Sequence, residues 1–303
     1  MDAAYEKMKK NLEALAEQQQ RAADEAPDAD EIVSLAFEGR SIKVALYRAA
    51  PEAPVVFAFH GGGFLIGSFV ADAPLFCEMS RRMGVTIVSV AYRKAPAHVF
   101  PTALYDCYDA MAYVIEHAGE LGICADDVSV YGYSAGGNLA AAVCLLDAQR
   151  GGRLGISRQY LSYPYLDLAT SPADKGYVVG ERPVYEIFRD LYCEGHDATD
   201  PLASPVYASE ELLAQMPPAI IALAERDPLM AEGARYACRL RAAGVPVKLM
   251  MAPNMAHGYC ELAFQVETPY MDELSRAQLR EGSMLACCLQ TIDFMAAGFG
   301  ALR

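Results

Sequence analysis

The chain has 303 residues, enough for one large domain or two small ones with a substantial buried core. Hydrophobic residues make up 53% and charged residues 21%, which is typical of a globular protein. The 39 acidic residues outnumber the 25 basic ones, and no stretch concentrates basic residues. We therefore expect no nucleic-acid partner, because phosphate binding needs a basic patch.

The cysteines and the first residues bear on the compartment of the protein. Nine cysteines are scattered without a CxxC pair or the spacing of metal ligands, which predicts reduced thiols, no metal site and a cytoplasmic protein. The start of the chain lacks the basic-then-apolar order of a signal peptide. The longest apolar stretch, residues 54–76, contains His60, Asp72 and several glycines, so we expect no membrane span.

The first predicted element is an amphipathic helix over about residues 3–25, because apolar side chains such as Met8 and Leu12 recur at helical spacing. Pro27 is expected to end this helix. Since the helix precedes the first strand, it either frays or folds back over the body of the protein as part of a lid. We favour the lid, and we assign residues 1–30 to a cap.

Strands and helices alternate from about Ser41 onward. Residues 42–47 alternate apolar and polar side chains, as expected of a strand at a sheet edge. Residues 55–59 and 85–91 are continuous apolar runs, typical of strands buried on both faces of a parallel sheet. Further strands are predicted at 128–133, 159–163, 219–224 and 247–251, and helices at about 73–82, 101–118, 134–149 and 275–297. The alternation predicts one α/β domain, 1–303, with a mostly parallel central sheet flanked by helices.

The alternation breaks between about residues 169 and 216, where no strong buried strand is predicted. This insertion contains several prolines and the apolar side chains of Tyr177, Tyr185, Ile187, Phe188, Leu191 and Tyr192. An aromatic insertion between strands is typical of a cap over an active site. The alternative is that these side chains pack an additional helix pair onto the sheet, and both can hold together.

The strongest motif is Gly132-Tyr133-Ser134-Ala135-Gly136, a G-x-S-x-G pattern between an apolar run and an alanine-rich helix. A strand that turns sharply into a helix presents a serine hydroxyl where a base can reach it, and that turn needs flanking glycines. The bare pattern also occurs by chance in glycine-rich chains. The strand before it and the helix after it favour the catalytic interpretation, with Ser134 as nucleophile.

A second motif, His60-Gly61-Gly62-Gly63-Phe64, directly follows the buried strand at 55–59. Glycines without side chains can turn their backbone N–H groups toward the oxygen of a substrate carbonyl. We predict an oxyanion hole formed by the N–H groups of Gly62, Gly63 and Ala135. A flexible turn is the alternative, but a turn rarely needs three glycines after a core strand.

The general base is predicted to be His257, because it follows the last core strand, where the loops of a parallel sheet gather around an active site. A lone surface histidine is the alternative. The other four histidines lie in the glycine loop, a proline-rich loop, a helix end and the insertion: His60, His98, His117 and His196.

The acid that orients the base has two similar candidates, since Asp-Pro-Leu occurs at Asp200 and at Asp227. Asp227 follows the apolar run 219–224 and is therefore predicted at the carboxyl end of a strand, so we choose it. Glu232 is the second choice, but its position is more simply explained if it lies in the first turn of the helix that follows. The order Ser134, Asp227, His257 matches the order of nucleophile, acid and histidine in the α/β-hydrolase fold.

Together these motifs resemble the hormone-sensitive-lipase-like esterases, the bacterial HGGG-type branch of the α/β-hydrolases. The likeness runs from about Val55 to Gly258. It is carried by the two motifs above and by Tyr92-Arg93-Lys94-Ala95-Pro96, Phe100-Pro101, Asp106, Ser204-Pro205, Asp227-Pro228-Leu229 and His257-Gly258. The resemblance implies an α/β-hydrolase fold, a helical cap built from the N-terminal segment and the insertion, a carboxylester hydrolase activity and no cofactor.

The chain departs from the family pattern at several positions. Tyr133 stands where the family commonly has Asp, Lys94 and Ala97 stand where it has Leu and Glu, and Met230-Ala231 replaces an Arg-Asp pair. These changes remove supporting polar partners rather than catalytic groups. We expect Tyr133 to narrow one wall of the site, and we predict that Phe64 and Tyr133 contact the substrate.

The sequence therefore predicts a serine carboxylester hydrolase that acts on small-molecule esters with small to medium acyl groups. The alternatives are an amidase or peptidase with the same triad, or a non-catalytic ligand-binding relative, since fold does not dictate function. The last strand and helix are candidates for a homodimer contact.

Overall fold

A computed structural model describes residues 3–22, 28–171, 174–175, 184–265, 271 and 273–300. Eight strands form one sheet in the order β1-β2-β4-β3-β5-β6-β7-β8. The strands are β1 (Glu31–Phe37), β2 (Arg40–Tyr47), β3 (Val55–Phe59), β4 (Thr86–Val90), β5 (Val128–Tyr133), β6 (Ile156–Ser162), β7 (Ala219–Ala224) and β8 (Val247–Ala252). All neighbouring pairs from β4 to β8 are parallel, whereas β1 and β2 form an antiparallel hairpin whose second strand pairs with β4. The predicted fold class is confirmed.

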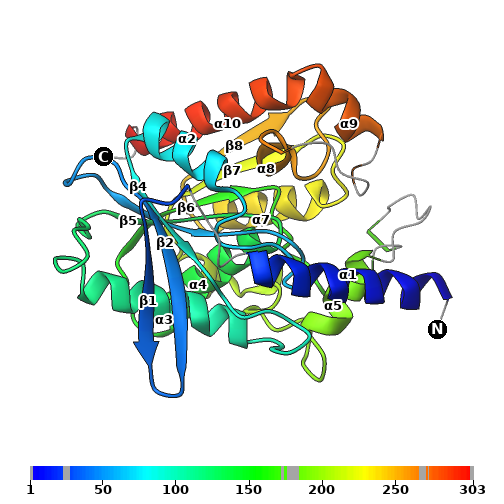
Figure 1. Ribbon diagram of the computed structural model, residues 1–303, viewed down its shortest axis with the longest axis horizontal. Coiled ribbons are helices and arrows are strands. Elements are labelled where there is room, and N and C mark those ends of the chain that lie inside the picture. The colour runs from blue at the N-terminus through cyan, green and yellow to red at the C-terminus, as the bar shows by residue number, and fades with distance from the viewer. Residues whose placement is uncertain are drawn as a thin grey trace.

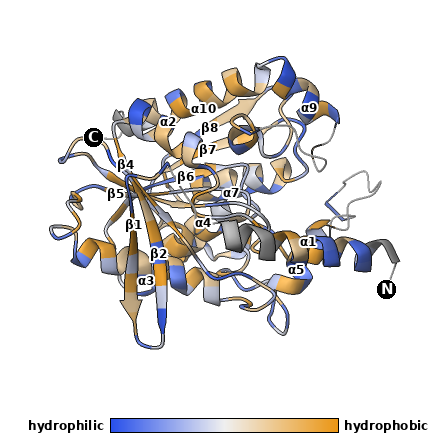
Figure 2. Cartoon of the chain, viewed as in Figure 1, coloured by the Kyte–Doolittle hydropathy of each residue, from blue (hydrophilic) through white to orange (hydrophobic). Residues whose placement is uncertain are grey.

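Helices cover both faces of the sheet (Figure 1). On one face lie α2 (Ala73–Met83), α8 (Tyr259–Leu262) and α10 (Ser283–Gly300), and α2 and α10 pack side by side. On the other face lie α3 (Thr102–Glu116), α4 (Ala135–Gln149) and α7 (Met230–Ala242). Hydrophobic colours dominate the sheet strands in Figure 2, as expected for a sheet whose inner strands β3, β4, β5 and β7 are buried along their whole length.

The predicted cap segments contain helices and no strand in their described parts. They are α1 (Ala3–Ala22), α5 (Val184–Tyr192), the 3₁₀ turn η1 (Pro205–Tyr207) and α6 (Glu210–Leu213). The first two lie side by side in Figure 1, and the Tyr5 hydroxyl donates a 3.0 Å hydrogen bond to the Asp190 carboxylate. The N-terminal helix therefore packs against the insertion. Its role as a lid stays a prediction, and Pro27 and Tyr177 lie outside the described residues.

Two predicted elements were wrong in detail. The strand at 42–47 is not at the sheet edge, because β1 pairs with its outer side through the register Glu31↔Leu46 to Phe37↔Arg40. The predicted closing helix at 275–297 is two helices, α9 (Glu273–Arg280) and α10, because Gly282 has a φ of 70° that interrupts the helical path. No helix in the described part of the chain is long and apolar enough to cross a membrane.

Candidate active site

The G-x-S-x-G segment forms a sharp turn between β5 and α4. Ser134 has φ 55° and ψ −123°, a conformation that non-glycine residues rarely adopt and that occurs at strained functional turns. A Cβ on Gly132 would lie 2.0 Å from the carbonyl oxygen of Gly136, and a Cβ on Gly136 would lie 1.9 Å from that of Phe59. Both glycines are therefore required by the close approach of α4 to β3 and β5.

The three residues predicted as a triad come together at the carboxyl ends of the parallel strands. Ser134 follows β5, Asp227 follows β7 and His257 follows β8. The Nε2 atom of His257 lies 2.9 Å from the Ser134 hydroxyl oxygen, and its Nδ1 atom lies 2.8 Å from a carboxylate oxygen of Asp227. These two distances fit a neutral imidazole that donates to the carboxylate from Nδ1 and accepts from the serine at Nε2.

The surroundings of His257 raise the pKa of its imidazole. Burial lowers the pKa of this imidazole, but the charge and hydrogen bond of Asp227 raise it, helped by the charges of Glu261 and Glu232, and the net pKa lies above the usual 6.5. The other carboxylate oxygen of Asp227 accepts a 2.8 Å hydrogen bond from the backbone N–H of Leu229. Asp227 is thus held in place on both sides, which fits a group that orients an imidazole and stabilises its charge.

The alternative acids lie in other surroundings. A carboxylate oxygen of Glu232 accepts from the backbone N–H groups of Leu166 at 2.7 Å and Asp167 at 3.2 Å, and the other pairs with Lys175 at 2.5 Å. Burial raises the pKa of Glu232 to about 7. Asp200 accepts from the backbone N–H of Leu202 within its own turn. Glu232 is therefore tied to the loop after β6 instead of to the imidazole.

The glycine loop after β3 carries the predicted oxyanion donors. Gly62 and Gly63 have φ values of 109° and 61°, which favour glycine. The Gly62 carbonyl accepts from the N–H groups of Leu65 and Ile66, at 3.1 and 2.9 Å. Among the described residues, neither the Gly62 N–H nor the Gly63 N–H donates to another backbone carbonyl. Ala135, the third predicted donor, is the first residue of α4. The oxyanion role stays a prediction.

Three side chains support this loop, and sequence reasoning did not assign them that role. Lys94 donates a 2.5 Å hydrogen bond to the Gly67 carbonyl, and burial lowers the pKa of its amine to about 8. The Tyr92 hydroxyl donates to the His60 carbonyl at 2.8 Å, and the Tyr92 and His60 rings stack with centroids 4.3 Å apart. Burial lowers the pKa of His60 to about 3, so this ring is neutral. The position of Lys94 in a family motif was the available signal.

The two predicted substrate contacts are both buried side chains. The Phe64 ring stacks on the ring of Tyr192 from α5, with centroids 3.8 Å apart. The Tyr133 ring fills the space beside Gly61, where a Cβ would lie 2.8 Å from it, and its hydroxyl bonds to Asp72. Their roles toward a substrate stay predictions. Neither Asp72 nor its bond to Tyr133 was anticipated, because the two residues are far apart in sequence.

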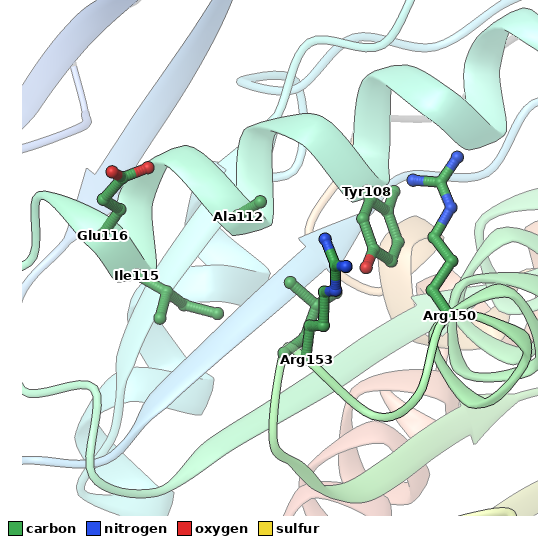
Figure 3. A pocket seen from close by; sticks show the side chains of 7 residues that line it. Tyr108, Ala112, Ile115, Glu116, Arg150 and Arg153 are labelled. Carbon is green, nitrogen blue, oxygen red and sulfur yellow. The ribbon is translucent and has the colours of Figure 1, made fainter.

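A separate cavity of about 510 Å³ is shown in Figure 3. It lies along α3 and the end of α4 and is lined by Tyr108, Ala112, Ile115, Glu116, Arg150, Arg153 and Leu154, none of which is a predicted site residue. The Arg150 guanidinium lies 4.4 Å from the centroid of the Tyr108 ring. Within the residues that the structure describes, no cluster of three or more His, Cys, Asp or Glu side chains could hold a metal ion.

Comparisons with known proteins agree with the fold. The family model for the α/β hydrolase fold matches residues 56–261. The chain is 36% identical to an arylesterase of Saccharolobus solfataricus over 209 residues, 68% of each chain. It is 33% identical to an ethyl acetate hydrolase of Pseudomonas putida over 258 residues, 81% of this chain and 80% of the relative.

Solved structures agree as well. A thermostable esterase from Pseudomonas putida superposes with a TM-score of 0.79 at 28% identity, covering 98% of this chain and 92% of the other. The resemblance seen in the sequence motifs is thereby confirmed. The chain belongs to the α/β-hydrolase fold family, among the hormone-sensitive-lipase-like esterase enzymes.

Proposed function

We propose that this protein is a carboxylester hydrolase that cleaves esters with small to medium acyl groups through an acyl-enzyme on Ser134. The observation that carries the proposal is the unbroken line of contacts from Asp227 through His257 to Ser134, at 2.8 and 2.9 Å. The names of the relatives, an arylesterase and an ethyl acetate hydrolase, support ester substrates.

In the proposed acylation, Nε2 of His257 takes the proton of the Ser134 hydroxyl while the serine oxygen attacks the ester carbonyl carbon. The carbonyl oxygen becomes an anion that accepts from the N–H groups of Gly62, Gly63 and Ala135. The bond to the alcohol oxygen then breaks, and the alcohol leaves with the proton from the imidazolium, whose charge Asp227 stabilises. Loss of one oxyanion donor is expected to reduce kcat by about 10²- to 10³-fold.

Deacylation repeats these steps with water. His257 takes a proton from the water, the hydroxyl oxygen attacks the acyl carbon, and the bond to Ser134 breaks. The serine oxygen recovers the proton from the imidazolium and the carboxylic acid is released. No cofactor is needed in this scheme.

The side chains of α5 support a preference for small to medium acyl groups. The Tyr185 ring lies edge-on to the His257 ring, with centroids 6.4 Å apart. The Phe188 ring covers Gly63 so closely that a Cβ there would lie 2.2 Å from it. These two rings limit the room beside the predicted nucleophile and oxyanion loop. Because one methylene changes discrimination by only about 1–3 kcal/mol, the preference is expected to be graded.

The test compares p-nitrophenyl butyrate with the matching p-nitroanilide, using the native protein and Ser134→Ala. We expect fast hydrolysis of the ester, slow or no hydrolysis of the anilide, and no ester hydrolysis by the variant. Faster hydrolysis of the anilide would favour an amidase, and hydrolysis of neither would favour a ligand-binding protein. A p-nitrophenyl series from acetate to palmitate measures the acyl preference.

A further inference from the structure

The two hydrogen bonds of His257 alone do not define the tilt of its ring. They run from Nδ1 to Asp227 and from Nε2 to Ser134, on opposite sides of the ring. The ring is also attached to the backbone through Cβ, and the χ2 torsion of a histidine has broad minima. Packing around the ring therefore limits the tilt that these two bonds leave open.

Tyr163 supplies such a contact. Its ring meets the His257 ring edge-on, with centroids 5.2 Å apart and an angle of 72° between the planes. This arrangement is favourable for aromatic pairs and is sensitive to their relative tilt. Tyr163 follows β6, comes directly after Ser162, and is completely buried.

Tyr163 is itself held from several directions. Its hydroxyl donates to a carboxylate oxygen of Glu261 at 2.5 Å and accepts from the backbone N–H of Cys260 at 3.2 Å. Its own N–H donates to the Ala222 carbonyl at 2.7 Å. Its φ of 36° is unusual for a residue with a side chain, and such strain persists only where the surroundings enforce it. The ring is therefore a fixed surface against which the imidazole rests.

Glu261 connects this surface to the histidine loop. It lies in α8, four residues after His257, and the left-handed Gly258 makes the turn between them. Its partly buried carboxylate adds negative charge near the imidazole, which raises the pKa of His257. Burial raises the pKa of Glu261 to about 7, while the Tyr163 hydrogen bond and the His257 charge lower it. The titratable groups that face Glu261 come from four segments: Tyr131 and Tyr133 of β5, Tyr163 after β6, Asp72 before α2, and His257 and Cys260 around α8.

We propose that Tyr163 and Glu261 are a positioning pair for His257: the Tyr163 ring fixes the tilt of the imidazole, and Glu261 holds that ring and favours the imidazolium. Both residues act through His257 and are positioning residues. The inference rests on the proposed function, because it assigns roles within the same site.

The test uses Tyr163→Phe, which keeps the ring, and Glu261→Gln, which keeps an acceptor for the Tyr163 hydroxyl but removes the charge. Hydrolysis of p-nitrophenyl butyrate by each is measured between pH 5 and pH 9. Tyr163→Phe is expected to lower kcat by about 10- to 100-fold with little change in KM, because the ring loses the hydroxyl bonds to Glu261 and Cys260 that hold it against the imidazole. Glu261→Gln is expected to lower the pKa of the acid limb of kcat/KM, so the ratio of activity at pH 6 to that at pH 8 rises.

The matched controls are Tyr105→Phe and Glu120→Gln, which change exposed residues of the same types. Both controls should keep the kcat and the pH profile of the native protein. If Ser134→Ala is inactive but Tyr163→Phe and Glu261→Gln keep the native kcat and profile, the positioning pair is wrong and the proposed function stands. If Ser134→Ala is fully active, the proposed function itself is wrong, and the positioning pair has no role to play in it. If Tyr163→Phe does not fold, the pH profile of Glu261→Gln tests the proposal alone. An acid limb with the native pKa in that variant would then show that Glu261 does not act on His257.

Discussion

The Tyr133 hydroxyl donates a hydrogen bond to a carboxylate oxygen of Asp72, a residue 61 positions earlier in the chain. Tyr133 is the residue immediately before the predicted nucleophile, where the family commonly has an acidic side chain. Burial raises the pKa of Asp72 to about 6, while hydrogen bonds from Tyr133 and Gln265 lower it. An acidic side chain is thus present beside the turn, but it comes from the segment before α2.

Replacing Tyr133 with Phe removes one donor from a buried carboxylate. We expect the free energy of unfolding to fall by about 1–3 kcal/mol, the usual effect of an unsatisfied buried polar group. The loss should be larger at pH 8, where Asp72 is ionised, than at pH 5, where it is mostly protonated. Urea unfolding at both pH values measures this, with Tyr105→Phe as the exposed control. An equal loss at the two pH values would mean that the bond to Asp72 does not stabilise the turn.

The close approach of α4 to β3 makes Gly136 sensitive to any side chain. In Gly136→Ala the new Cβ would lie 1.9 Å from the Phe59 carbonyl oxygen, so backbone must move. We expect a loss of more than about 4 kcal/mol in the free energy of unfolding, together with loss of activity. Gly119→Ala is the control, because a Cβ there meets nothing within 4 Å. Equal stability of the two variants in thermal unfolding would contradict the steric account of the turn.

The pH dependence of the native protein follows from His257. The base must be neutral to accept the serine proton, so kcat/KM should fall as the pH decreases through its pKa. Because Asp227, Glu261 and Glu232 together raise that pKa, the acid limb is expected above pH 6.5. A pH–rate profile with a p-nitrophenyl ester measures it. A midpoint well below 6.5 would show that another group controls the reaction.

Asp227 and Glu232 are expected to respond differently to neutralisation. Asp227→Asn should reduce kcat by about 10⁴-fold, because the amide cannot hold the imidazole in the required tautomer. Glu232→Gln should mainly reduce stability, because it leaves the buried amine of Lys175 without its charged partner. Steady-state rates and urea unfolding of both variants separate these effects. A larger loss of kcat in Glu232→Gln than in Asp227→Asn would show that Glu232, and not Asp227, orients the imidazole.

Much of the sheet and the meeting of the triad residues follow from sequence patterns. The runs at Val55–Phe59 and Ala219–Ala224 are strands with these same bounds, because continuous apolar residues without breakers suit only a buried strand here. The proximity of Ser134, Asp227 and His257 could be predicted from the sequence, because each residue follows a parallel strand. The carboxyl ends of such strands lie at one edge of the sheet.

The supporting contacts could not be predicted in the same way. Tyr163 and Glu261 are 98 positions apart and Tyr133 and Asp72 are 61 apart, so no local period connects them. The position of β1 at the edge depends on a hairpin whose turn contains Gly39, at φ 73°. These features depend on how distant segments pack, which a single sequence does not reveal.

The proposed function requires that Ser134 becomes acylated, and covalent labelling detects whether this serine is reactive. The native protein is treated with a p-nitrophenyl alkylphosphonate, which transfers its phosphonyl group to an activated serine, and its intact mass and peptides are then measured. We predict one adduct per chain, on the peptide that contains Ser134, and none in Ser134→Ala, with Asp227→Asn reacting much more slowly. An adduct on another residue, or equal labelling of Ser134→Ala, would show that Ser134 is not the nucleophile.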